Sequence, residues 1–197
     1  MSTAVPAAVA RPQQPRPQAP PTLLFIPEIR AMLEEGRALT PDDYRRIAVT
    51  LRVSLTTATT SDNSVYRVFG THKMLITGIR GHLVLTSPSG DSAIGIANFT
   101  TNLKDVRELK AMNCRITFIN QDDSTNILGE NLAIALSTLM PSAGGEALDW
   151  RNAPHIVPPG ATVQMTATLI TTVSPYVGNA TEYGITVDAT LVRVAAS

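Results

Sequence analysis

Residues 47–55 read IAVTLRVSL, in which every second side chain is apolar. The same alternation returns in residues 163–169 (VQMTATL) and 185–191 (ITVDATL). A period of two is that of a β-strand with one apolar and one polar face. Because these segments are far apart in the chain, their apolar faces can be covered only by one another. The pattern therefore predicts a mainly β protein, a single jelly-roll-like β-sandwich with one or two short helices and an extended N-terminal arm.

Short apolar runs and turn residues alternate through the rest of residues 47–197. The run 74–86 predicts a strand with a bulge, because Gly78 and Gly81 interrupt its apolar pattern. Residues 102–112 fit a short helix or an irregular loop, and residues 128–140 fit a helix or a loop that leads into a short strand. Further short strands are predicted at 65–69, 93–99 and 114–119, and turns at 61–64, 87–91, 121–125 and 158–160.

The N-terminal residues 1–27 differ from the rest, since they hold half of the 14 prolines. Such a segment is expected to be extended and unable to fold alone. It ends in an apolar run that needs a surface to cover it, formed by Leu23, Leu24, Phe25 and Ile26. We predict that this run anchors the arm on a neighbouring subunit; a plain linker is the alternative.

Residues 28–46 are predicted to be helical and to join the arm to the sandwich. Ile29–Gly36 predicts a short helix that Gly36 ends. The sequence Thr40-Pro41-Asp42-Asp43 is typical of a helix N-terminus, so a second short helix is expected as far as about Arg46.

Composition argues against several classes of protein. The formal net charge is zero and charged residues are 16% of the chain, whereas a nucleic-acid binder carries a basic excess. Sparse charge and many threonines are typical of proteins that pack against copies of themselves. The single cysteine, Cys114, cannot form an intrachain disulfide and is expected to be buried in a strand. We also expect no membrane span, because no run of about 18 apolar residues exists, and no signal peptide.

Motifs that would indicate catalysis or a cofactor are not found in the sequence. The three histidines, His72, His82 and His155, have no metal-ligand spacing, and alternation places His82 on a polar face. Asp122-Asp123 is expected to be an ordinary turn rather than a calcium loop. We therefore expect no enzyme activity, no metal and no cofactor.

Trp150 is the only tryptophan, in a loop that leads to Pro154. It is either an anchor that pins this loop to the sandwich or an exposed platform for a ligand such as a sugar. Anchoring is favoured, because a single aromatic side chain in a proline-bearing loop fills a core site efficiently.

Three segments carry a family resemblance: FGTHKMLITGIRGHLVL (69–85), ALDWRNAPHIVPPGATVQMTATL (147–169) and EYGITVDATLVRV (182–194). Their apolar spacing and turns resemble those of small jelly-roll structural proteins of tailed bacteriophage virions, over residues 47–197. The resemblance implies a non-enzymatic minor capsid, decoration or collar protein that is assembled in the host cytoplasm. Its expected partners are copies of itself and other virion proteins of the capsid or connector, with neither nucleic acid nor membrane.

An alternative function is a receptor- or carbohydrate-binding module of a phage fibre or tail tip. That function would require exposed aromatic side chains near Trp150, Tyr176 and Tyr183.

Overall fold

The computed structural model describes residues 26–36, 38–85, 103–129, 133–141, 145–172 and 181–194. The chain divides into two units, Met1–Leu39 and Thr40–Ser197. The first unit contains helix α1 (Pro27–Glu34), with proline at its start and Gly36 in the left-handed region (φ 72°) just after its end. This helix confirms the predicted one. Ile26 is its N-cap residue and is buried, whereas Leu23, Leu24 and Phe25 lie outside the described residues.

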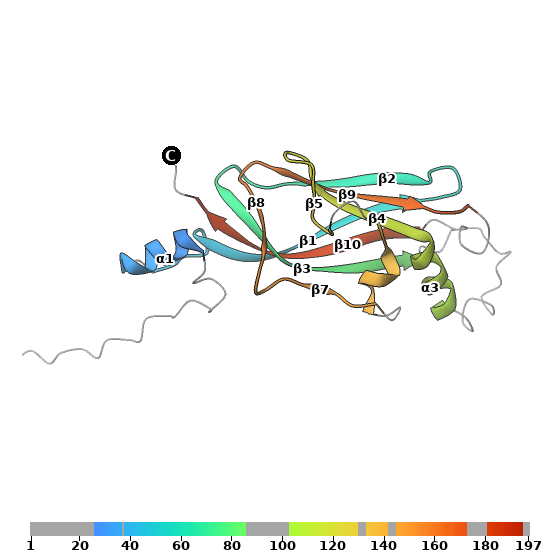
Figure 1. Cartoon of the computed structure of the whole chain (residues 1–197), viewed down its shortest axis with the longest axis horizontal. Helices are drawn as coiled ribbons and strands as arrows, with labels where there is room; N and C mark the ends of the chain where they lie inside the picture. The colour runs from blue at the N-terminus through green and yellow to red at the C-terminus, as the bar shows by residue number, and fades with distance from the viewer. Residues whose placement is uncertain are drawn as a thin grey trace, which may run out of the picture. The chain divides into compact units, whose positions relative to one another are not determined.

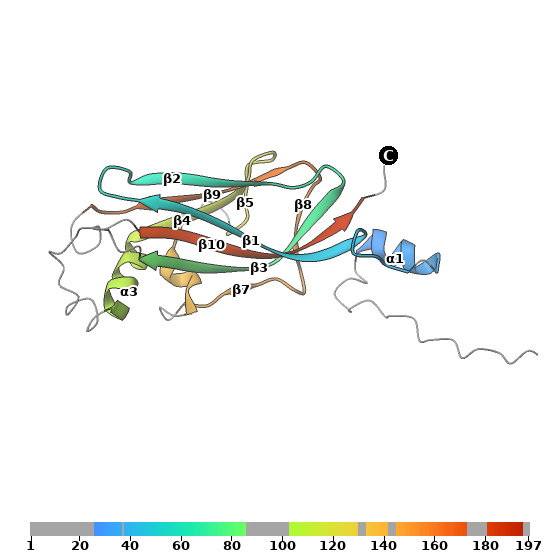
Figure 2. The same cartoon turned by 180° about the vertical axis from the view of Figure 1, so that it is seen from behind.

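The second unit is a sandwich of two antiparallel sheets (Figures 1 and 2). Sheet A has the strand order β1-β10-β3-β7, and β8 also pairs with β3. Its strands are β1 (Tyr44–Leu55), β10 (Thr181–Arg193), β3 (His72–Leu85), β7 (Leu148–Asp149) and β8 (His155–Val157). Sheet B has the order β2-β9-β4-β5, and β6 also pairs with β4. Its strands are β2 (Ser61–Arg67), β9 (Thr162–Leu169), β4 (Cys114–Asn120), β5 (Thr125–Asn126) and β6 (Ile134–Ala135).

Strand pairing is nested along the chain. The first strand pairs with the last (β1 with β10), the second with the next to last (β2 with β9), the third with β7 and β8, and the fourth with β5 and β6. This is the connectivity of a long hairpin that has wrapped into two layers, which defines a jelly roll. The predicted jelly-roll-like sandwich is therefore confirmed, whereas the predicted extended arm lies almost wholly outside the described residues.

Both sheets bury the faces that the alternation predicts. Leu51, Val53 and Leu55 are buried, and Ile47 and Val49 pack against the same core at partial exposure. The alternate residues of β9 and β10 are also buried: Val163, Met165, Ala167, Leu169, Ile185, Val187, Ala189 and Leu191. Cys114 lies in this core as expected, and burial raises the pKa of its thiol to about 12.

Two short helical segments flank the strands. Helix α3 (Leu103–Asn113) settles the open assignment of residues 102–112, and its buried Lys110 donates a hydrogen bond from Nζ to Thr181 Oγ1 at 2.8 Å. Residues 133–141 form β6 followed by the 3₁₀ helix η2 (Leu136–Leu139). This helix packs where Gly81 has no side chain, because a Cβ there would lie 2.8 Å from Leu136.

The predicted second helix, residues 40–46, is wrong. Thr40–Asp43 forms a single turn, in which the Asp43 carboxylate accepts hydrogen bonds from Thr40 N (2.9 Å) and Oγ1 (2.7 Å). The chain then enters β1 at Tyr44, and Arg193 N donates to Asp43 O at 2.8 Å. Pairing with β10 therefore overrides a sequence that is locally suited to a helix.

The turn predicted at residues 61–64 is also wrong, because β2 already begins at Ser61. The reversal lies just before it, where Thr56 Oγ1 accepts hydrogen bonds from Ala58 N and Thr59 N. Turns are present as predicted at residues 121–124, just before β5 begins at Thr125, and at Pro158–Gly160, where Gly160 has φ 78°. The turn predicted at 87–91 and the edge strand predicted at 93–99 lie outside the described residues.

Candidate functional site

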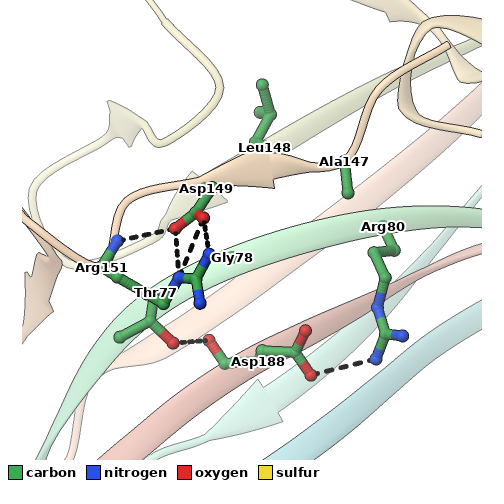
Figure 3. Close-up of a pocket in the computed structure, with 8 residues that line it drawn as sticks. All are labelled: Thr77, Gly78, Arg80, Ala147, Leu148, Asp149, Arg151 and Asp188. Atoms are coloured by element: carbon green, nitrogen blue, oxygen red, sulfur yellow. Dashed lines mark hydrogen bonds and ion pairs between the residues drawn. The ribbon is translucent and has the colours of Figure 1, made fainter.

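A hollow of about 240 Å³, lined by both apolar and charged residues, opens beside the middle of β3, between β10 and β7 (Figure 3). Two arginines and two aspartates contribute its charges. Its described lining consists of Thr77, Gly78, Arg80, Ala147, Leu148, Asp149, Arg151 and Asp188.

The hollow is built on the predicted bulge in β3. Gly78 pairs with Asp188, but Ile76 already pairs with Ala189, so Thr77 is the extra residue. The bulge changes which alternate residues point inward: Ile76 is buried before it and Ile79 after it. Thr77 Oγ1 donates to Asp188 O at 3.1 Å, and its carbonyl accepts a hydrogen bond from Trp150 N at 2.8 Å.

Gly78 allows β7 to approach this bulge. A Cβ at Gly78 would lie 3.0 Å from the carbonyl oxygen of Leu148. β7 then pairs with β3 through Gly78–Asp149 and Ile79–Leu148, which places Asp149 and Arg151 beside β3.

Both acids in the hollow are paired with arginines. Asp149 accepts hydrogen bonds from Arg151 N at 3.0 Å and from Arg151 Nε at 2.9 Å, with a further close ion pair to Nη2. Asp188 Oδ1 accepts a hydrogen bond from Arg80 Nη2 at 3.1 Å. The hydrogen bonds from Arg151 lower the pKa of Asp149 to about 2.

The paired charges limit the chemistry of this hollow. With a pKa of about 2, Asp149 is ionised at neutral pH and cannot act as a general acid. The described lining contains no histidine, cysteine or serine that could act with it as base or nucleophile. The hollow can offer hydrogen-bond donors and acceptors to a polar partner.

The sequence does not single out these four charged residues. Arg80 and Asp188 are 108 positions apart, and only the pairing of β3 with β10 brings them together. Asp149 and Arg151 are close in sequence, but this pair lines the hollow only because β7 pairs with β3.

Trp150 packs against the hydrophobic core at partial exposure. It is not among the described residues that line the hollow, although Asp149 and Arg151 on either side of it are. Of the other aromatic residues that a ligand platform would use, Tyr183 is buried (1% exposed) and Tyr176 lies outside the described residues. The exposed aromatic that a binding module would require at Tyr183 is therefore not found, because alternation in β10 turns this side chain into the core.

The histidines lie in three different places. His72 is the first residue of β3, and His155 is the first residue of β8. Burial is the main cause that lowers the pKa of His155. Within the described residues, no three His, Cys, Asp or Glu side chains are grouped so that they could hold a metal ion. Asp122 and Asp123 lie in the turn after β4, where the Asp123 carboxylate accepts a hydrogen bond from Thr125 N at 2.9 Å.

His82 covers a glycine on the outward face of sheet A. A Cβ at Gly184 would lie 2.5 Å from the His82 ring, so the ring occupies the space that a side chain would fill. Its Nδ1 is buried and has no hydrogen-bond partner in the described structure. Burial and the nearby Arg52 guanidinium lower the pKa of His82 below 6.5, with Glu182 acting in the opposite direction.

We expect the protein to lose stability between pH 7 and pH 5, in part through His82. Folding lowers the pKa of His82, so below about pH 6.5 the unfolded chain binds more protons than the folded protein. The free energy of unfolding therefore falls as the pH is lowered, until the pKa of the folded state is reached. Urea unfolding at the two pH values would measure the loss. It should be smaller in His82→Gln, and an equal loss in both proteins would contradict this role of His82.

No helix among the described residues has the length and apolar character needed to cross a membrane. Comparison of the chain with protein-family models found no match, and comparison with curated proteins found none either.

Proposed function

We propose that this chain is a non-enzymatic structural protein of a virion, a minor capsid, decoration or collar protein. In this proposal the sandwich forms a symmetric homo-oligomer, and the N-terminal arm fastens it to neighbouring subunits of the capsid or connector. The observation that carries the proposal is the nested jelly-roll pairing of the strands, in which β1 pairs with β10 and β2 pairs with β9. Jelly rolls are the sandwiches of many viral capsid proteins and also of lectins.

The aromatic side chains favour the structural function over a lectin-like one. A sugar-binding face depends on exposed aromatic rings, but Trp150 packs against the core and Tyr183 is buried. The hollow beside β3 offers paired charges rather than an aromatic platform. Fold alone does not decide function, so these side chains are the more specific support.

The division of the chain supports a fastening role for its N-terminal segment. The sandwich strands all lie in Thr40–Ser197, whereas the proline-rich segment and α1 belong to Met1–Leu39. A segment outside the sandwich can bind a neighbour without disturbing the core. Identical subunits repeat such a contact, so that small individual gains add up through avidity.

Removing residues 1–25, which ends before α1, is expected to leave the sandwich folded and to abolish assembly. The reason is that every described strand of both sheets is kept, while Leu23, Leu24 and Phe25 are lost. Circular dichroism would check the fold, and sedimentation velocity with a particle-incorporation assay would check assembly.

A matched variant, Phe25→Asp in the full chain, should weaken assembly in the same direction. Unchanged oligomeric mass and unchanged incorporation after the deletion would overturn the proposed function of the arm.

A further inference from the structure

The outward face of sheet B is almost free of charge. Its strands turn alternate residues away from the core, as the burial of Val163, Met165 and Ala167 on the opposite face shows. None of the outward residues of the three long strands is acidic, and two are basic. They are Ser61, Asn63, Val65 and Arg67 on β2, Thr162, Gln164, Thr166 and Thr168 on β9, and Arg115, Thr117 and Ile119 on β4.

The outward face of sheet A has the opposite character. Ion pairs cross it from strand to strand, between Arg52 and Glu182 (3.2 Å) and between Arg80 and Asp188 (3.1 Å). His82 lies between these pairs, beside Gly184. The two outward faces of one sandwich therefore differ in charge.

Depletion of charge is the compositional signature of an interface core. On sheet B, hydrogen bonds already join outward polar side chains to one another. They link Ser61 Oγ with Thr168 Oγ1 (2.9 Å), and Gln164 Nε2 donates to Thr166 Oγ1 (3.0 Å). Val65 exposes 54% of its surface in the same row as Gln164 and Ile119. Small β-branched side chains leave room for a second sheet about 10 Å away.

The positions of the two arginines fit a second copy of the same face. Arg115 pairs with Thr168 at one end of β9, and Arg67 pairs with Thr162 at the other end, on the opposite strand. The two arginines therefore occupy diagonally opposite corners of the outward face of sheet B. In an aligned face-to-face packing the twofold axis lies close to the strand direction or close to perpendicular to it.

Both axes keep the arginines apart. With the axis along the strands, Arg115 faces Ser61 of the second copy and Arg67 faces its Gln121; with the axis across the strands, these two assignments are exchanged. Gln121 belongs to this face because it hydrogen-bonds Gln164. Each guanidinium thus meets an oxygen acceptor rather than another cation.

We propose that the outward face of sheet B packs against the same face of a second copy of this chain. The inference rests on the proposed function, in which subunits self-associate, and adds the surface that they use. Thr166 lies at the centre of this face, between Asn63 and Thr117. In the two packings it meets Thr166 or Gln164 of the second copy.

Introducing charge at Thr166 tests the proposal in the full chain. In Thr166→Asp and in Thr166→Lys, a buried charge is placed at the centre of the interface, and both should shift the protein from its wild-type oligomer to a smaller species in sedimentation velocity. The matched control is Thr186→Asp, because Thr186 is also half-buried and outward on a central strand, between Thr50 and Arg80 of sheet A. The control should keep the wild-type oligomer, and thermal unfolding should confirm that all variants fold.

The outcomes separate the surface from the function. The sheet B interface is wrong if the wild type is an oligomer and both Thr166 variants keep its mass. It is also wrong if the Thr166 variants dissociate and Thr186→Asp dissociates with them. In both cases self-association of the chain stands. Dissociation of only one of the two Thr166 variants would also contradict this interface, because a buried charge of either sign should open it. A monomeric wild type at all concentrations would instead overturn the self-association in the proposed function.

Discussion

Replacing Phe118 with alanine is expected to lower the free energy of unfolding by about 3–5 kcal/mol, the usual loss for a fully buried phenylalanine. Phe118 is completely buried in the middle of β4, paired with Met165 on β9. Its ring fills space between the two sheets, so alanine leaves a cavity that a paired strand cannot collapse into. Since domains are stable by only about 5–15 kcal/mol, urea unfolding should show a large shift of the midpoint.

Phe69→Ala is the matched control for Phe118→Ala. Phe69 is 50% exposed, and its ring centroid lies 5.5 Å from the guanidinium carbon of Arg45. Loss of this contact is expected to cost less than about 1 kcal/mol. Equal losses in the two variants would contradict the placement of Phe118 in the core.

Alternation was sufficient to predict the central strands, because a two-layer sandwich requires one apolar and one polar face. The buried residues of β9 and β10, Val163 to Leu169 and Ile185 to Leu191, are those that the pattern indicates. The bulge was also visible, because Gly78 and Gly81 interrupt the apolar pattern of this strand. These features are local, and their physical cause is the periodicity of the strand itself.

The errors arise where partners distant in sequence decide the structure. Residues 44–46 resemble a helix but pair with the end of β10, and residues 61–64 resemble a turn but form the start of β2 on β9. A polar edge strand has no apolar alternation to reveal it, since its backbone hydrogen bonds hold it in place.

The candidate site was beyond prediction for the same reason. Asp149–Arg151 is a local pair, but the hollow also needs Arg80 and Asp188 from two other strands. Their approach depends on register, and register depends on the bulge at Thr77.

Replacing Gly184 with alanine is expected to destabilise the protein by about 3 kcal/mol, at the upper end of the usual cost of overpacking. A Cβ at this position would lie 2.4 Å from the carbonyl oxygen of Leu51 and 2.5 Å from the His82 ring. The ring can rotate away, but the carbonyl belongs to β1, which pairs with β10 over its full length. Relief therefore requires β1 and β10 to move apart where they are paired.

Gly70→Ala is the control for Gly184→Ala, because no atom lies within 4 Å of a Cβ at Gly70. Its effect on urea unfolding should be small. Adding His82→Ala to Gly184→Ala should recover only part of the loss, since it removes the contact with the ring and leaves the contact with Leu51. Full recovery would mean that His82 alone requires a glycine here, and no loss in Gly184→Ala would contradict the close approach of β1 to β10 at this residue.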